Sequence, residues 1–449
     1  MSEAVTTRQQ ELAGKYRPYP EYKDSGVVWL GEMPSTWVLA KTARYFKIAM
    51  GQTILKEQLE DDGEWPVYSA TEGDHYFGRV NNPQVRLGCG DLVIPARGNS
   101  IGFVKLVKEQ VTTTQTTIYC KHLTQKIYPE YAYYFMVGQK KNLFWFTQTA
   151  IPQITVEEIG SNPILLPSFE EQRTIAAFLD YETARIDRLI AQQQRLIELL
   201  KEKRQAVISH AVTKGLKPHA PMKDSGVEWL GQVPEHWDVP AIKYIVSTPI
   251  TDGPHETPEF LDSGVPFISA EAISGGFIDF DKKRACISVQ DNARYSKKYS
   301  PRKNDIYMVK SGATTGVTAI VETDDEFNIW SPLAAIRCNS TSNPYFVLNF
   351  LRSRNFLEAI ELNWSFGTQQ NIGMGVIGNL HVTRPPLGEA ILIADYINKE
   401  CTKFGLIIER AEAMTRLLQE RRIALISAAV TGKIDLRGWT PPTDSEVAA

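Results

Sequence analysis

The chain contains two pairs of matched segments, and this repetition limits its fold more than any other feature. Residues 23–37 read KDSGVVWLGEMPSTW, and residues 223–237, at an offset of 200, read KDSGVEWLGQVPEHW. Residues 199–216 read LLKEKRQAVISHAVTKGL, and residues 417–434, at an offset of 218, read LLQERRIALISAAVTGKI. Self-similarity at a fixed spacing is typical of duplicated structural units. The sequence therefore predicts two half-molecules, each with a leading segment, a body and a tail.

The two bodies differ although the segments around them match. Residues 38–167 and 238–385 share only faint similarities, such as G-D-L at 90–92 against N-D-I at 304–306. A simple duplication would leave similarity throughout each half. Matched frames with different bodies instead indicate two domains that do the same kind of work on different targets.

The first tail is predicted to be one long helix. Residues 170–214 contain no Gly or Pro and consist mainly of good helix formers. Ser168 and Glu171 form a capping-box pair at its start, and Gly215 stands where a helix commonly ends. At 1.5 Å per residue the helix is about 65 Å long, which favours a coiled coil or a strut. Its apolar residues form one stripe: Ile175, Leu179, Ile186, Leu189, Leu196, Leu200 and Val207.

The second tail, residues 389–431, repeats this stripe. It lacks the Ser cap and has Gly405 inside, which costs about 1 kcal/mol in a helix, so we expect a weaker or more kinked helix. Two helices with matching stripes predict an antiparallel pair that relates the bodies by a pseudo-two-fold axis. The alternative is that each helix packs only on its own body. The stripe residues are Ile393, Ile397, Phe404, Ile407, Met414, Leu418 and Leu425.

The bodies read as mixtures of short strands and a few helices. Apolar runs at 91–96, 116–120, 305–310 and 317–321 are broken by turn residues, and residues 345–362 read as a helix. The predicted fold class is therefore α+β, with two mixed domains joined by two long helices that form an antiparallel coiled coil.

Composition places the chain among ordinary soluble proteins. Apolar residues make up 43% and charged residues 22%, and no run of eighteen apolar residues predicts a membrane span. Five cysteines without a C-x-x-C pair favour a reducing compartment, so a cytoplasmic location is expected. The net charge of −3 does not indicate a nucleic-acid binder, although a local basic face is enough to bind DNA.

The order of the matched segments resembles one known family. Segments 23–37, 167–172, 202–215, 223–237 and 420–433 together look like those of the specificity subunit of Type I restriction–modification systems. The resemblance implies that each body is a target recognition domain for one half of a split, asymmetric DNA sequence. It also implies that the helices set the spacer and dock methyltransferase subunits. The second copy departs at 386–389, where P-L-G-E replaces the S-F-E-E of 168–171, so the start of the second helix stays open.

This resemblance implies a division of the chain and a set of partners. We expect an N-terminal tail (1–22), recognition domain 1 (23–168), a central helix (169–215), recognition domain 2 (216–386), a distal helix (387–434) and a C-terminal tail (435–449). The expected partners are double-stranded DNA, two modification subunits that use S-adenosylmethionine, and two restriction subunits that use ATP and Mg. The complex would methylate adenine N6 and cleave DNA with ATP. The chain itself is expected to be non-catalytic and to bind no cofactor, metal or membrane.

Candidate DNA contacts come from three patterns. The run 294–303 has five positive charges and two tyrosines, which suits phosphates, although a solvated loop looks the same. Loops at 96–100 and 310–315 follow apolar strands and carry groups that bind bases or backbone, although a hairpin turn is an equal alternative. Amides precede both long helices and suit adenine or phosphate, although a turn before a strand also uses them. The candidates are Arg97, Asn99, Ser100, Gln148, Gln153, Arg294, Lys297, Lys298, Arg302, Lys303, Lys310, Thr314, Thr315, Gln369, Gln370 and Asn371.

Other features favour structural roles. Trp29, Trp37, Trp229 and Trp237 are the same in both halves whereas targets should differ, so we interpret them as core residues. No P-loop and no acidic-or-Asn Pro-Pro-aromatic element of an adenine methyltransferase is present, and the seven histidines form no metal-ligand pattern. Two rival hypotheses remain: a coiled-coil adaptor without base readout, and a self-contained DNA-modifying enzyme with unrecognised motifs.

Overall fold

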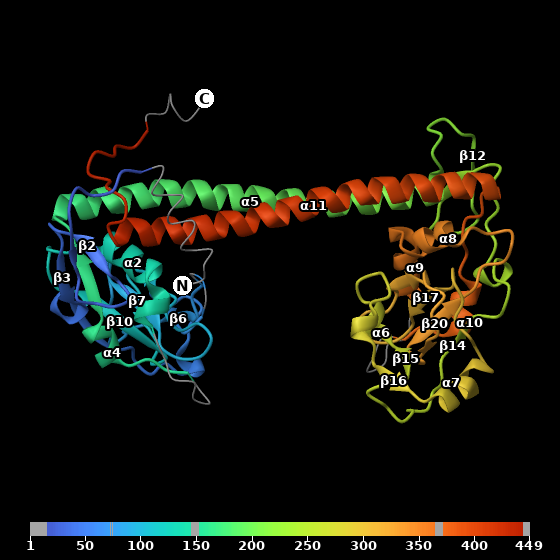
Figure 1. Cartoon of the computed structure of the whole chain (residues 1–449), viewed down its shortest axis with the longest axis horizontal. Coiled ribbons are helices and arrows are strands. Elements are labelled where there is room, and N and C mark those ends of the chain that lie inside the picture. The colour runs from blue at the N-terminus through green and yellow to red at the C-terminus, as the bar shows by residue number, and fades with distance from the viewer. Residues whose placement is uncertain (1–15, 72, 74, 145–151, 364–370, 443–449) are drawn as a thin grey trace. The chain divides into compact units, whose positions relative to one another are not determined.

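The computed structural model describes residues 16–442 except 72, 74, 145–151 and 364–370. The chain divides into two compact units, one formed by Met1–Gln194 with Glu412–Ala449 and the other by Arg195–Ala411. We call them unit 1 and unit 2. Each contains both sheets and helices, together with a segment of each long helix (Figure 1). The predicted mixture of helix and sheet is therefore confirmed.

Within its described residues, unit 1 opens with a hairpin and holds three further sheets. Strand β10 lies inside an antiparallel sheet of order β4-β10-β7-β8, and β5 pairs antiparallel with β6 and parallel with β9. The strands are β1 (Tyr22–Asp24), β2 (Glu32–Pro34), β3 (Val38–Lys41), β4 (Phe46–Met50), β5 (Trp65–Tyr68), β6 (Gly78–Val80), β7 (Leu92–Pro95), β8 (Lys105–Leu106), β9 (Thr112–Thr113), β10 (Thr117–His122) and β11 (Pro163–Leu166), which pairs with β3.

The helices of unit 1 cover the four-stranded sheet. Tyr131 and Phe135 of α2 are fully buried in one core with Phe46 and Ile118 of the sheet. The side chain of Gln139, just after α2, donates to the Ser427 hydroxyl at 3.0 Å, so the body is tied directly to the long-helix segment of its own unit. The helices are η1 (Thr42–Arg44), η2 (Lys56–Gln58), α2 (Pro129–Gly138), α3 (Lys140–Leu143) and α4 (Val156–Ser161).

Unit 2 has the same strand order. Its four-stranded sheet runs β14-β20-β17-β18, and β15 pairs antiparallel with β16 and parallel with β19. The elements are β12 (Met222–Asp224), β13 (Gln232–Pro234), η3 (Ile242–Tyr244), β14 (Thr251–Asp252), β15 (Val265–Ile268), α6 (Ala270–Ile273), η4 (Phe280–Lys282), β16 (Ala285–Ile287), α7 (Val289–Ser296), β17 (Ile306–Val309), β18 (Thr318–Ile320), β19 (Asn328–Ile329), β20 (Leu333–Ile336), α8 (Pro344–Leu351), α9 (Arg354–Asn363) and α10 (Met374–Asn379).

The two tails are the long helices α5 (Phe169–Lys214) and α11 (Leu387–Val430). The Glu171 amide donates to the Ser168 hydroxyl at 3.3 Å, and Gly215 has a φ of 76°, so the predicted start and end of the first helix are confirmed. The helix α11 begins directly after Pro386, whose carbonyl accepts the Ala390 amide at 2.9 Å. This proline stands at the start of the second helix in place of the Ser cap of the first, and it has no N–H group that would need an acceptor there.

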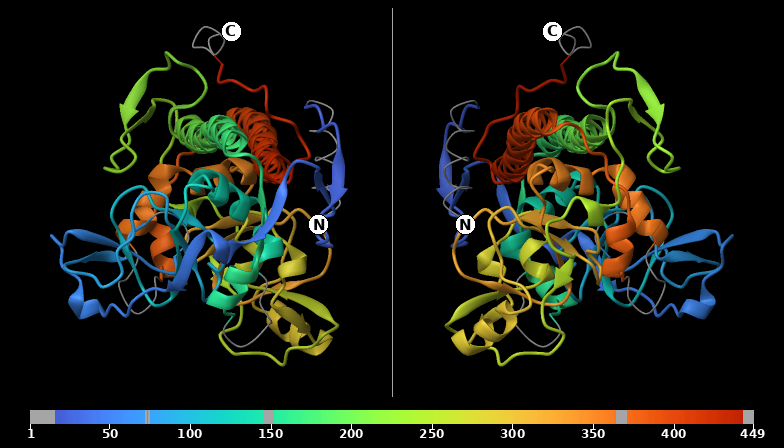
Figure 2. Two further views of the ribbon diagram at one scale, coloured as in Figure 1. Left: turned by 90° about the vertical axis from the view of Figure 1, so that its left-hand side faces the viewer. Right: turned by 90° about the vertical axis from the view of Figure 1, so that its right-hand side faces the viewer.

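Segments of α5 and α11 lie side by side within each unit (Figure 2). In unit 1, Arg422 of α11 donates to Asp187 of α5 at 2.8 Å. In unit 2, Ile208 and Val212 of α5 share one buried core with Ile393 of α11.

The predicted stripes are buried only in part. Ile175 and Leu179 of α5 and Ile393 of α11 are fully buried. The exposed stripe residues are Leu189, Leu196, Ile407 and Met414.

The strand predictions are confirmed, and one helix prediction needs a correction. The four apolar runs correspond to β7, β10, β17 and β18. Residues 345–362 form two helices rather than one, because α8 and α9 are separated at Arg352 and Ser353, where the Ser353 hydroxyl donates to the Phe350 carbonyl at 2.6 Å. Over the ranges that the structure covers, no helix has both the length and the apolar character needed to cross a membrane.

Candidate nucleic-acid interface

A short loop follows the third strand of the four-stranded sheet in each unit. Residues 96–102 connect β7 to β8, and residues 310–316 connect β17 to β18. The glycines at 98 and 102 have φ angles of 75° and 73°, and those at 312 and 316 have 102° and 92°. Only glycine adopts such angles at little cost, which explains why both loops carry glycines at the same two places. We call these the unit 1 loop and the unit 2 loop.

Each loop is fixed against the segment that precedes a long helix. In unit 1, Arg97 bridges Gln153, and the Ile154 amide donates to the Ala96 carbonyl at 3.0 Å. In unit 2, Ser311 bridges Asn371 in the same way. The structure therefore brings together candidates that are more than fifty residues apart in sequence, and it places an amide side chain beside each loop.

The loop candidates differ in their exposure. Arg97, Asn99 and Gln153 are exposed in unit 1, as is Asn371 in unit 2. By contrast, Ser100 is buried and donates to the Ala70 carbonyl at 2.8 Å, so its hydroxyl lies inside the domain.

The hydroxyls of the unit 2 loop are less accessible than these amides. Thr314 and Thr315 are half-buried, and the Thr315 hydroxyl donates to the Gly312 carbonyl at 2.7 Å. Thr315 therefore stabilises the turn in the conformation that the structure describes.

The basic run is largely paired with carboxylates of its own domain. Arg294 contacts both Glu256 and Asp291 at 2.8 Å. Lys303 lies 3.7 Å from Asp324. Within the described residues, Lys297 and Arg302 form no ion pair, and both are exposed. The free positive charge of this run is therefore smaller than its sequence indicates.

Two lysines and one histidine surround a buried carboxylate in unit 2. Asp252 on β14 is fully buried, and its Oδ1 accepts from Lys298 at 2.5 Å. Its Oδ2 lies 3.3 Å from Lys310 Nζ and 3.1 Å from His255 Nε2. Burial acts to raise the pKa of Asp252, but the hydrogen bond and charge of Lys298 and the charge of Lys310 outweigh it, so the pKa is lowered. The carboxylate therefore stays ionised.

Asp252 and His255 are absent from the sequence-based candidates. The signal available was an acidic residue beside an apolar stretch, because Asp is depleted in strands and a buried one needs a partner. The partners Lys298 and Lys310 lie far along the chain, so the pattern alone did not identify them. The candidates Gln148, Gln369 and Gln370 lie outside the described residues.

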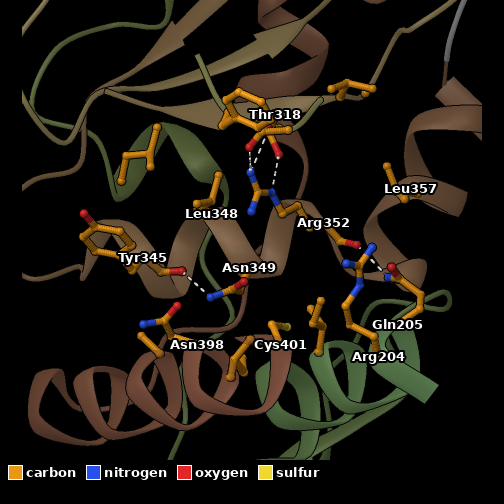
Figure 3. A pocket seen from close by; sticks show the side chains of 18 of the residues that line it. Arg204, Gln205, Thr318, Tyr345, Leu348, Asn349, Arg352, Leu357, Asn398 and Cys401 are labelled. Carbon is orange, nitrogen blue, oxygen red and sulfur yellow. Dashed lines mark hydrogen bonds between the residues drawn. The ribbon is translucent and has the colours of Figure 1, made fainter. Parts of the chain in front are cut away.

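A cavity of about 1060 Å³ lies in unit 2 among α5, α8, α9 and α11 (Figure 3). Its most deeply placed cation, Arg352, donates to the Thr318 carbonyl and hydroxyl and to the Gly276 carbonyl. Asn349 is turned along its own helix, where it donates to the Tyr345 carbonyl at 2.9 Å. These polar groups already have protein partners.

Unit 1 has a larger side chain at the corresponding place. Tyr134 follows the first proline of α2 by five residues, as Asn349 follows that of α8. Its hydroxyl donates to Asp180 of α5 at 2.7 Å and thus spans the space between body and long helix. In the ranges that the structure describes, no three His, Cys, Asp or Glu side chains gather where they could hold a metal ion.

Comparison with known proteins finds similarity to one family. Residues 34–199 match the family described as "Type I restriction modification DNA specificity domain". The chain is 26% identical over 258 residues to the Type I restriction enzyme MjaVIII specificity subunit of Methanocaldococcus jannaschii, which covers 55% of this chain and 57% of that protein. It is 30% identical over 194 residues to the Type I restriction enzyme EcoBI specificity subunit of Escherichia coli, which covers 41% of this chain and 40% of that protein. The chain thus spans about half the length of the curated relatives it matches.

A solved structure supports the fold over a longer range. It is described as the "structural basis underlying complex assembly and conformational transition of the type I R-M system", and the TM-score is 0.68 at 16% identity. The match covers 90% of this chain and 99% of that one. Residues 34–199 thus match a Type I restriction modification DNA specificity domain, and the chain is similar to the specificity subunits of Type I restriction enzymes.

Proposed function

We propose that this chain is the DNA sequence-specificity subunit of a Type I restriction–modification complex. In this proposal each unit carries one target recognition domain, residues 23–168 and 216–386, and each domain reads one half of a bipartite, asymmetric DNA target. The observation that carries the proposal is the pair of matched loops with different side chains. Arg97 and Asn99 stand in the unit 1 loop where Ser311 and Ala313 stand in the unit 2 loop. Two loops of similar backbone conformation but different side chains suit two domains that recognise different bases.

The proposal assigns the spacer to α5 and α11 as an antiparallel coiled coil with pseudo-two-fold symmetry. The beginning of α5 shares a unit with the end of α11, and the end of α5 shares a unit with the beginning of α11, which supports antiparallel pairing. Two readers joined by a rigid helical element contact half-sites at a fixed separation.

The same helices offer apolar surface to partner proteins. Leu189 of unit 1 is 38% exposed and Leu196 of unit 2 is 40% exposed, although both belong to the predicted stripe. We propose that such residues help to dock two modification subunits, which use S-adenosylmethionine to methylate adenine N6. Two restriction subunits, with ATP and Mg, would supply cleavage. The chain itself is proposed to be non-catalytic and cytoplasmic.

The proposal is tested by mapping methylated adenines genome-wide after co-expression with the modification subunit. The expected result for the unaltered chain is one split, asymmetric motif. Gln153→Ala should relax bases of one half only, and Asn371→Ala should relax bases of the other half only. Gln84→Ala, an exposed amide of unit 1 away from the loop, serves as the control.

Two other results would contradict the proposed function. An assembled complex that methylates no defined motif would favour the adaptor hypothesis. Methylation by the purified chain alone with S-adenosylmethionine would favour a self-contained enzyme.

A further inference from the structure

Lys298, Lys310 and His255 lie around Asp252 in two layers. Asp252 is fully buried, and the Lys310 side chain, which is 13% exposed, lies behind the surface with it. Lys298 is 49% exposed and His255 is 70% exposed, and both contact the same carboxylate from the outside. Two lysine ammonium groups face this one carboxylate, so one positive charge is left over. The outer layer thus presents one ammonium group and one imidazole.

The group lies at the base of the unit 2 loop. The Lys310 amide donates to the Pro332 carbonyl, and the Lys310 carbonyl accepts the Ile372 amide, both at 2.8 Å. Lys310 therefore joins the loop, the sheet and the segment that carries Asn371. Lys298 also donates to the Gly253 carbonyl at 3.3 Å, which limits where its ammonium group can move.

Unit 1 has uncharged residues, Met50 and Ala96, at the places of Asp252 and Lys310, and Met50 is 37% exposed whereas Asp252 is fully buried. Strand pairing puts Asp252 opposite Ala334 and, in unit 1, Met50 opposite Ile118. Ala96 holds the corresponding place at the start of the unit 1 loop, where its amide donates to the Thr116 carbonyl at 3.0 Å. Because β4 pairs with β10 in unit 1 without these charges, the equivalent pairing of β14 with β20 does not itself require the ion pair. Buried ion pairs seldom add stability over apolar residues of similar volume, so another role is needed.

We propose that Asp252 gathers Lys298, Lys310 and His255 into a site for a DNA backbone phosphate beside the half-site read by unit 2. Lys298 and His255 contact the phosphate oxygens, and Asp252 acts as a positioning residue. This inference rests on the proposed function. Phosphate contacts carry no base information but fix the register of a reader on the duplex. Unit 2 thereby contacts the DNA backbone beside β14, and unit 1 has no charged side chain at the equivalent place beside β4.

The test measures the affinity of the complex with its modification subunit for a duplex at several salt concentrations. Each lysine–phosphate contact contributes about one to the slope of log affinity against log salt. Lys298→Gln should therefore lower the slope by about one, and Lys298→Arg should restore it. The matched control is Lys282→Gln, because Lys282 is 59% exposed and pairs with Asp279 at 3.2 Å in the same unit. A Lys298→Gln slope equal to that of the unaltered complex would overturn the site.

The positioning role has its own variant. The double change Asp252→Met with Lys310→Ala installs the unit 1 pair and leaves the net charge unaltered. If only the net charge mattered, the slope of log affinity against log salt would not change. If Asp252 positions Lys298, the double change should lower this slope by about one. An unaltered slope would refute positioning by Asp252.

The His255→Gln variant and the comparison of DNA binding with methylation distinguish failure of this site from failure of the proposed function. If the double variant does not fold, His255→Gln, at an exposed position, should still weaken binding, and full affinity would count against the site. The slope is measured on any duplex. A complex that binds DNA without a methylation motif therefore refutes the proposed function alone, while loss of the Lys298 effect refutes this site alone.

Discussion

At the scale of single residues, the two leading segments use the same tryptophan in different hydrogen-bond networks. Trp37 and Trp237 are both fully buried, as predicted for core residues. Trp37 Nε1 donates to Glu171 at 3.1 Å, and the Tyr19 hydroxyl donates to the same oxygen at 2.5 Å. Burial and this bond raise the pKa of Tyr19 well above its usual range. In unit 2, Trp237 Nε1 has no acceptor among the described residues.

This difference predicts unequal effects of removing the equivalent acids. Glu171→Ala leaves two buried donors unpaired and should lower the free energy of unfolding of unit 1 by about 2–5 kcal/mol. Glu389 contacts the half-exposed His236 at 2.7 Å instead of Trp237, so Glu389→Ala should cost about 1 kcal/mol or less. Urea unfolding followed by hydrogen exchange of each unit measures both. Equal losses of unfolding free energy in the two variants would show that the hydrogen bonds of Trp37 and Tyr19 to Glu171 add no stability.

The lowered pKa of Asp252 predicts a pH dependence for unit 2. A carboxyl whose pKa is lower in the folded state contributes stability above its unfolded pKa, near 3.8, and loses it as the pH falls through the folded value. The unaltered chain should therefore lose stability in unit 2 below about pH 4, and Asp252→Met with Lys310→Ala should lose less over that range. Urea unfolding at pH 7 and pH 3 checks this, and identical losses in both proteins would contradict it.

At the scale of elements, the long helices differ in their interior residues. Gly405 lies inside α11, and an added Cβ at this position would meet no atom within 4 Å. Gly405→Ala should therefore stabilise the chain by about 1 kcal/mol. Gly215→Ala is the matched control with the opposite sign, because Gly215 has a φ of 76° and its added Cβ would lie 3.3 Å from Trp237. Thermal unfolding monitored by the helical circular dichroism signal measures both. If Gly405→Ala leaves the stability unchanged, Gly405 does not weaken the second helix.

Helix bounds could be predicted closely because they depend on neighbouring residues. The absence of Gly and Pro from 170–214 and the cap at Ser168 agree with α5 to within one residue. The break between α8 and α9 was missed because Ser353 is compatible with a helix locally and is set by packing. It is fully buried beside α5, where the amide of the next residue, Arg354, donates to the Ser209 hydroxyl at 2.9 Å.

At the scale of the whole molecule, the proposal makes the spacer a property of the helices and the half-sites a property of the bodies. Inserting four residues into the middle of α5, with four opposite them in α11, adds about 6 Å of helix. The methylation motif should keep both half-sites while its spacer lengthens by about two base pairs. Methylation mapping decides this, and altered half-sites with an unchanged spacer would contradict the division of roles.

The net charge of −3 leads to a further expectation at this scale. Much of the basic run is paired with acids of its own domain, so the isolated chain should bind DNA weakly, and partner subunits should complete the contact. Filter binding of the isolated chain and of the complex to the same duplex compares the two. A nanomolar, salt-sensitive affinity of the chain alone would refute this expectation.

The two-part organisation, the long helices, the main strands and the similarity to Type I specificity subunits could all be predicted from the sequence. Each of these depends on residues close together in the chain or on ordered motifs. Which candidate DNA-binding side chains lie together, and which already bond to other protein groups, depends on the tertiary structure. It joined Arg97 to Gln153, buried Ser100, and set Asp252 against Lys298 and Lys310. Such contacts depend on strand register, where a shift of one residue turns every side chain to the other face, and no local pattern encodes that choice across distant strands.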